Sequence, residues 1–361
     1  MQTFLIYNSI MIFSFLFAFL YEQEKRREIK IFFIVLSFLC MWIPAAIREG
    51  IGTDYYNYIN YLHQVEGGIP NVRTEIGFYL ILKIIAFFNL NSQWLFVITS
   101  FLTVLFVFLS IKKYFSLSIL FYNILLLDLY SYNIVKQGLA VAIVMYAVSN
   151  LIDGHKLKYI IFVLLASSVH MMSLLCLPFV FFYKINYKII ITVGIIILVF
   201  ISSIDIVSLI LKIPMIGERY GIIYFFNSVY GVEQESSIWG FFARFIPGVL
   251  ILLFSRNFLI KRPEYGSVVI MVLIYLCAAL LRLRYFIFYR LVQFFLFPLV
   301  FMIPVLFDSI RKNNIFNTSV RYVVIIVIIL LSIASYEAYI TRETSTVFGI
   351  KNVVPYSSIF H

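Results

Sequence analysis

The feature that most constrains this chain is a succession of ten mostly apolar runs, separated by short loops that carry many lysines and arginines. Each run is close to the roughly 20 residues that a helix needs to cross the hydrocarbon core of a bilayer. Only 12% of the residues are charged, about half the fraction found in soluble domains, so the chain cannot cover a water-facing globule. The sequence therefore predicts an all-α, polytopic integral membrane protein. The ten runs are Thr3–Leu20, Ile31–Ile47, Trp94–Ile111, Phe115–Tyr132, Ile134–Ile152, Lys188–Ile204, Ile238–Phe254, Ser267–Leu281, Phe288–Phe307 and Tyr322–Ile340.

Two further apolar segments are ambiguous, because Gly77–Leu90 is short for a span and Tyr159–Tyr183 is interrupted near His170. Lysines and arginines concentrate in cytoplasmic loops. If both segments crossed the bilayer, the lysines at 112, 113, 156 and 158 would lie outside. If both return to the face from which they enter, these lysines lie inside with the other basic loops. We therefore predict about ten full spans, two re-entrant or partial segments, and both termini outside. The whole chain, 1–361, is predicted to be one membrane domain with external loops at about 48–75 and 205–237.

The net charge of +11 is explained by this topology, because the basic residues fall between the apolar runs, and no nucleic-acid partner is predicted. The three cysteines, Cys40, Cys176 and Cys277, lie within apolar runs. An odd, buried set predicts neither a disulfide framework nor a metal site, and no cofactor is expected. The first run lacks a cleavage site after it, so we interpret it as a retained span.

A set of basic residues remains that topology does not explain, because it is placed on or near the outer face. Ion pairs with external carboxylates are one interpretation. An anionic ligand is the other, and we prefer it for the set, because the planar fork of arginine suits phosphate oxygens. Lys136 begins its run with Asn133 and Gln137 at helical spacing on the same side. The set comprises Arg48, Arg73, Lys136, Arg219, Arg244, Arg282, Arg284 and Arg290.

The densest polar motif is the stretch from Arg48 to Tyr58. Its two glycines permit a sharp turn where the chain leaves the bilayer, after which Thr53 or Asp54 can cap a short helix. On that helix Asp54 and Tyr58 share one face with Tyr61. Such a helix is either an interfacial cap with a tyrosine belt or a sugar site with a carboxylate beside stacking rings. The lone His170, next to two serines, is likewise either hydrogen-bonded structure or a catalytic group.

Five stretches, taken together and in order, resemble the EpsG-like family of Wzy-type polysaccharide polymerases. The first motif is fairly specific, whereas the others carry weight only as an ordered set. One departure is Lys136, where the family usually has arginine, so bidentate recognition is lost there while the charge is kept. The stretches are Arg48–Tyr55 with Asn57 and Tyr58, Glu75–Tyr79, Asn133–Ala140, Ala166–His170 and Pro355–Phe360.

The resemblance implies a GT-C-like, multi-pass glycosyltransferase of the bacterial cytoplasmic membrane, with its active site facing the periplasm or the cell exterior. Such enzymes join oligosaccharide repeat units carried on undecaprenyl diphosphate, as in O-antigen, capsule or exopolysaccharide synthesis. The implied partners are the lipid-linked donor and acceptor, the bilayer, a chain-length regulator and a flippase. The alternatives are a lipid-linked oligosaccharide flippase, a glycan ligase or O-acyltransferase of the same pathway, and a purely structural membrane subunit.

On this interpretation the acceptor hydroxyl needs a base, for which Asp54 is the first candidate and His170 the second. Arg48 is expected to stabilise the leaving diphosphate, and no metal is expected. The remaining candidates are assigned to substrate binding. They are Lys136, Gln137, Asn133, Arg219, Arg244, Arg282, Arg284, Arg290, Tyr55 and Tyr58.

Overall fold

The computed structural model describes residues 2–52, 54–69, 74–190, 238–283, 288–311, 318–341 and 355–360, together with 192, 194 and 196. Within these ranges the chain is helical apart from turns and a single antiparallel bridge between Arg48 and Ser358. The all-α prediction is therefore confirmed. The chain divides into two compact units, Met1–Val180 with Tyr336–His361, and Phe181–Ser335, and each is described by itself.

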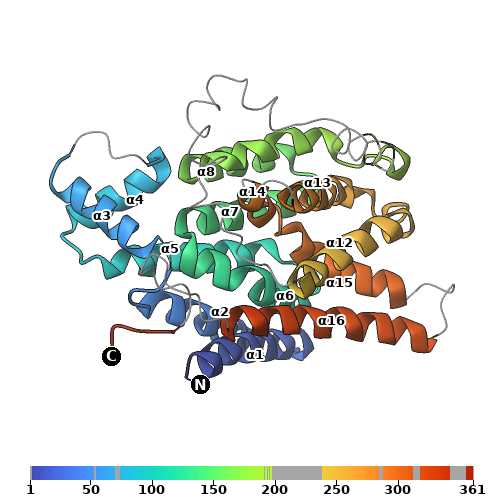
Figure 1. Ribbon diagram of the computed structural model, residues 1–361, viewed down its shortest axis with the longest axis horizontal. Coiled ribbons are helices and arrows are strands. Elements are labelled where there is room, and N and C mark those ends of the chain that lie inside the picture. The colour runs from blue at the N-terminus through green and yellow to red at the C-terminus, as the bar shows by residue number, and fades with distance from the viewer. Residues whose placement is uncertain are drawn as a thin grey trace. The chain divides into compact units, whose positions relative to one another are not determined.

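In the first unit α7 is the central helix, because nearly all its residues are buried. It packs against α5 and α8, while α1 packs against α2 and α6 (Figure 1). The π-helical segment η1 continues α6, and the 3₁₀ segment η2 follows α8. The elements are α1 (Gln2–Gln23), α2 (Arg27–Ile47), α3 (Tyr55–Glu66), α4 (Ile76–Phe87), α5 (Gln93–Ser110), α6 (Phe115–Tyr122), η1 (Asn123–Asn133), α7 (Val135–Ile152), α8 (Lys156–Val169) and η2 (Met171–Phe182).

In the second unit α13 is the buried helix, and it packs against α12, α14 and α15. Gly248 of α12 allows this contact, because a Cβ there would lie 2.9 Å from the side chain of Leu276. The last turns of α16 belong to the first unit. The elements are α12 (Ile238–Leu259), η3 (Pro263–Tyr265), α13 (Gly266–Arg282), α14 (Phe288–Phe294), α15 (Pro298–Arg311) and α16 (Thr318–Thr341).

Seven described helices are long and apolar enough to cross a membrane, and they correspond to seven of the ten predicted spans. The predicted span Phe288–Phe307 is the pair α14 and α15, bent by 55°. The predicted span Phe115–Tyr132 is a short apolar helix that continues into η1. Most of Lys188–Ile204 lies outside the described residues. The described part of the chain is therefore that of a multi-pass membrane protein.

The segment around His170 is a helical hairpin. Helix α8 ends at Val169, and His170 itself is extended. The Tyr159 hydroxyl, near the start of α8, donates a hydrogen bond to the carbonyl of Cys176. Because ten helical residues separate Tyr159 from Val169, about 15 Å, this bond can form only if η2 runs back along α8. The chain therefore turns back at His170, as the predicted re-entrant shape requires, and its entry from the cytoplasmic face stays a prediction.

The other ambiguous segment, α4, has 12 residues, about 18 Å, too short to cross a core of roughly 30 Å. Both its ends lie at one end of the bundle. Glu75, just before α4, contacts Lys136 at the start of α7. Gln93, just after α4, donates a hydrogen bond to the carbonyl of Arg48 at the end of α2.

Charges in the first unit separate between the two ends of the bundle. Lys112, after α5, pairs with Asp153, after α7, and Ser116 hydrogen-bonds Glu22, near the end of α1. These contacts lie at the end of the bundle opposite the Arg48 motif, and the loops there carry most of the basic residues of this unit. This is the arrangement that the distribution of lysine and arginine predicts, with the basic loops inside.

We expect Lys112→Cys and Lys156→Cys to react with an impermeant thiol reagent only from the cytoplasmic side. Tyr56→Cys, at a side chain that is 68% exposed, should react only from outside. The measurement is side-selective labelling of vesicles of both orientations, in a background without the three native cysteines. Reaction of Lys112→Cys from outside would contradict the re-entrant topology.

Candidate functional site

The turn after α2 depends on glycine. Gly50 and Gly52 have φ angles of 63° and 105°, where L side chains are strained. Gly52 also packs against the backbone of η1, since a Cβ there would clash with the Tyr132 carbonyl group and lie 3.3 Å from Cα of Asn133. The first and third sequence motifs are therefore in direct backbone contact.

We expect Gly52→Ala to disrupt this contact and to lower the thermal stability of the purified protein strongly. Gly68→Ala is the matched control, because Gly68 also has a positive φ, of 67°, but a Cβ there meets nothing within 4 Å. The control should lose only the backbone penalty, roughly 1 kcal/mol. Equal melting temperatures of the two variants in detergent would show that close packing at Gly52 is unimportant.

Arg48 is completely buried beside this turn. Its Nη1 donates to the Ala45 carbonyl at 2.7 Å, and the guanidinium lies 4.7 Å from the ring centre of Phe96 and 5.2 Å from that of Tyr132. Its Nε and Nη2 have no hydrogen-bond partner among the described residues. Burial lowers the pKa of Arg48 to about 10, so the guanidinium is still protonated at neutral pH.

Glu75 connects three motifs. Its Oε2 lies 2.9 Å from Lys136 Nζ, and its Oε1 lies 3.5 Å from His170 Nδ1. The approach of α4 to α8 depends on Gly77, because a Cβ there would clash with Ser168, lying 2.9 Å from its backbone carbonyl. Glycine at 77 thus allows the glutamate two residues earlier to reach the histidine two residues after Ser168.

The charge of Glu75 is fixed by its neighbours. Burial alone would raise the pKa of this carboxyl, but the His170 and Lys136 side chains outweigh burial and hold the pKa well below its usual value. Glu75 is therefore ionised at neutral pH and a weak base. Neither ring nitrogen of His170 has a hydrogen-bond partner among the described residues, and the Glu75 carboxylate lies near Nδ1 at the distance of an ion pair. A carboxylate near Nδ1 and an open Nε2 resemble the arrangement of a histidine that accepts a proton.

Asp54 lies next to this cluster. It precedes α3, yet its side chain makes no capping hydrogen bond. Tyr55 stacks on Phe96 with ring centres 4.4 Å apart, and Tyr58 is buried with its hydroxyl 3.5 Å from the backbone nitrogen of Lys136. Both rings therefore pack against protein, and Tyr58 connects the Asp54 helix to the Lys136 cluster.

Asn133 does not share a helix with Lys136, because η1 ends at Asn133 and α7 begins at Val135, whereas Lys136 and Gln137 both lie on α7. The side chain of Asn133 donates to the Tyr339 hydroxyl at 3.1 Å. Gln137 is buried, and its Nε2 has no partner within the described ranges. The sequence interpretation is therefore wrong for Asn133, because a new helix begins between Asn133 and Lys136.

In the second unit two of the predicted arginines come together. Arg244 and Arg282 are close enough to repel each other, and both act on the buried hydroxyl of Tyr275. The Arg282 guanidinium lies 4.5 Å from the ring centre of Tyr289. No described carboxylate forms a salt bridge with either arginine. Two adjacent cations of this kind favour an anionic ligand.

The other predicted arginines are less informative. Arg290 lies exposed on α14, which is separate from α13, so it does not share a helix face with Arg282. Arg219 and Arg284 lie outside the described residues, as does the external loop 205–237.

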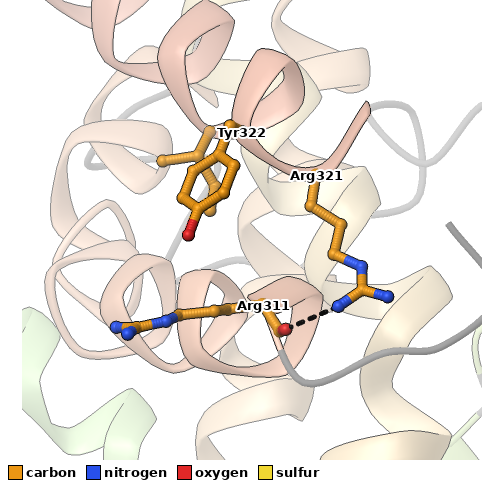
Figure 2. A pocket seen from close by; sticks show the side chains of 4 residues that line it. Arg311, Arg321 and Tyr322 are labelled. Carbon is orange, nitrogen blue, oxygen red and sulfur yellow. Dashed lines mark hydrogen bonds between the residues drawn. The ribbon is translucent and has the colours of Figure 1, made fainter. Parts of the chain in front are cut away.

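A small cavity lies between the ends of α15 and α16 (Figure 2). Arg321 donates a hydrogen bond to the carbonyl of Arg311 at 3.0 Å across it, with Tyr322 beside them. Its volume of about 30 Å³ is that of a water molecule and far below that of a small-molecule site. This cavity is therefore not a candidate for a sugar or lipid site.

The sequence interpretation did not assign Glu75 to the site, although the motif from Glu75 to Tyr79 contained it. Glu75 could have been found from its position, because it precedes an apolar segment too short to cross the membrane and is followed closely by a glycine. The aromatic residues around Arg48 were also missed, because phenylalanine and tyrosine are abundant throughout the chain.

Comparison with known proteins agrees with the ordered motifs. No curated protein and no solved structure matches the chain. The model of the EpsG family matches residues 30–358, nearly the whole chain. That match covers all the residues of the Arg48 turn and the Glu75, Lys136 and His170 cluster, so the chain belongs to the EpsG family.

Proposed function

We propose that this protein is a polysaccharide polymerase, a glycosyltransferase that joins oligosaccharide repeat units carried on undecaprenyl diphosphate. The observation that carries the proposal is the cluster of Glu75, Lys136 and His170. It lies at the end of the first unit opposite the basic loops, where the outer leaflet is expected. A lipid-linked sugar presents its reacting groups at this level of the membrane.

In the proposed reaction a hydroxyl of the acceptor sugar attacks the anomeric carbon of the donor. The new glycosidic bond forms as the bond to the donor diphosphate breaks, and the electron pair leaves with undecaprenyl diphosphate. The proton of the hydroxyl passes to His170 Nε2. One displacement of this kind inverts the anomeric centre.

Each side chain of the cluster has a separate role. Glu75 keeps the His170 ring oriented through Nδ1 and stabilises the imidazolium that forms. Lys136, with Glu75 beside it, contributes a fixed cation at 17% exposure. The Arg244 and Arg282 pair of the second unit is proposed to bind a lipid-linked diphosphate. Both donor and acceptor carry such a group, so the reaction offers more than one diphosphate to bind.

The test is a deletion strain analysed for surface glycan on a gel. A polymerase is supported by loss of the polymer ladder while one repeat unit remains attached to its lipid core. Complete loss of attached glycan would instead indicate a ligase or a flippase. Restoration of the ladder by the wild-type chain, but not by His170→Ala at equal membrane abundance, connects the function to this site.

A further inference from the structure

The burial of the Arg48 guanidinium has a free-energy cost that the contacts described so far do not explain. A buried charge whose hydrogen bonds are incomplete loses solvation that nothing replaces, and native structures rarely leave such groups unsatisfied. The two atoms without a partner, Nε and Nη2, form one edge of the guanidinium. That edge carries the two parallel N–H groups with which arginine binds a carboxylate or phosphate side-on. The unsatisfied pair is therefore the pair that an oxyanion would use.

The C-terminal segment Pro355–Phe360 packs directly beside Arg48. Glu49 N donates to the Ser357 carbonyl and Ile359 N donates to the Ile47 carbonyl, both at 3.0 Å. These bonds place Ser358 directly opposite Arg48, at the position of an antiparallel pair where side chains lie closest.

Tyr356 completes the cover. Its hydroxyl donates to the Pro44 carbonyl and its backbone nitrogen to Thr3 Oγ1, both at 2.9 Å. Its ring centre lies 5.9 Å from that of Tyr7. The segment thus joins the start of α1 to the end of α2, on either side of the buried guanidinium.

The other neighbours of Arg48 cannot move away easily. Tyr7, Phe96 and Tyr132 belong to long helical segments packed inside the first unit. The C-terminal segment, by contrast, has no helix among its described residues. It is held by the four hydrogen bonds and the ring contact named above, without helical packing, and it ends in side chains that are largely exposed, with Phe360 at 76%. Elements with few buried contacts open at the lowest free-energy cost.

We propose that Pro355–Phe360 is a removable lid over an oxyanion site at Arg48. Displacement of the lid uncovers the Nε and Nη2 edge, and an oxyanion then binds it side-on between the aromatic rings. The identification of this oxyanion as the diphosphate of a lipid-linked sugar rests on the proposed function. The lid itself rests only on the contacts around Arg48.

A ligand that binds only the open form shifts the population toward that form. Ser358→Cys changes one atom of a side chain that is 5% exposed, so its reaction with a thiol reagent reports opening of the lid. In a purified protein without the native cysteines, labelling should be slow. Farnesyl diphosphate should accelerate labelling several-fold, and Arg48→Gln should abolish the acceleration. Tyr56→Cys is the exposed control, whose rate should not change.

A second probe, inorganic pyrophosphate, distinguishes a site for free oxyanions from a site for the diphosphate of a lipid. Equal acceleration by pyrophosphate shows a general oxyanion site, whereas acceleration by farnesyl diphosphate alone shows a lipid diphosphate site. No acceleration by either probe, or slower labelling in their presence, overturns the lid.

A second variant locks the lid. Residues 49 and 357 are also opposite each other in the antiparallel register, so Glu49→Cys with Ser357→Cys should form a disulfide. The oxidised protein should lose accelerated opening and polymer formation, and reduction should restore both, with each single cysteine variant as control. Full polymer formation by the oxidised protein overturns the lid and leaves the polymerase proposal standing. Diphosphate-dependent opening without polymer formation supports the lid and contradicts the polymerase.

Discussion

His170→Ala is expected to slow polymer formation by about 10²–10⁴-fold, the loss usual when a general base is removed. Glu75→Gln should approach that loss, although it keeps the size of the side chain. The amide cannot stabilise the imidazolium, and it leaves Lys136 without its carboxylate partner. The measurement is the rate of linkage formation by purified protein with lipid-linked repeat units.

The two substitutions should not add, because both act through one histidine. The double variant should therefore be close in rate to His170→Ala alone. If the rate loss of the double variant equals the product of the two single losses, Glu75 acts independently of His170. Lys136→Arg is the conservative control, since it keeps the charge beside Glu75 and should retain most of the rate.

Asp54→Asn separates the two candidate bases. Asp54 makes no side-chain cap for α3, so the amide should leave expression and thermal stability nearly unchanged. If His170 is the base, this variant keeps most of its rate. A loss of about 10²–10⁴-fold in Asp54→Asn, with little loss in His170→Ala, would assign the base to Asp54, as the sequence alone favours.

Arg244→Ala is expected to reduce polymer formation by about 10²–10³-fold, the effect of removing one donor that stabilises a developing negative charge. Arg244→Lys should remain impaired, because a point charge does not replace a bidentate fork. Protein abundance in the membrane must be measured beside the rate, since the arginine lies within a span.

Arg256→Ala is the matched control for this prediction. Arg256 is on the same helix, α12, but in its last turn, where its guanidinium lies 5.8 Å from the ring centre of Tyr187. Loss of this cation should leave the rate in purified protein unchanged. Full activity of Arg244→Ala, or equal losses in both variants, would remove the diphosphate role of the arginine pair.

The sequence predicts much of the fold, because membrane crossing depends on local composition. Apolar length identified seven spans. Charge distribution predicted that Gly77–Leu90 and the segment around His170 do not cross the bilayer, and the chain does turn back at His170. Helix breaks that contain neither glycine nor proline are harder to predict from the sequence. The restart of the chain between Asn133 and Val135 placed Lys136 and its neighbours differently from the predicted face.

The candidate site was only partly predictable, because its contacts join residues far apart in the chain. Nothing local to Arg48 shows that Ser358 lies opposite it. Likewise, no spacing in the sequence shows that Gly77 meets Ser168, although this contact is what brings Glu75 to His170. The motifs supplied the candidate residues, and tertiary packing decided which of them meet.

The hairpin of α8 and η2 has a consequence for the energetics of polymer growth. Its first arm has 14 residues, about 21 Å, so a hairpin entering from the cytoplasm carries His170 roughly two thirds of the way through the hydrocarbon. A proton taken up there and released outward crosses the remaining third of the membrane voltage. The transmembrane potential costs about 2.3 kcal/mol per charge at 100 mV. The leaving diphosphate gains the matching negative charge, and both products leave by the face from which the substrates entered, so this work is returned over a full cycle. The net driving force for each new linkage is therefore independent of the membrane voltage.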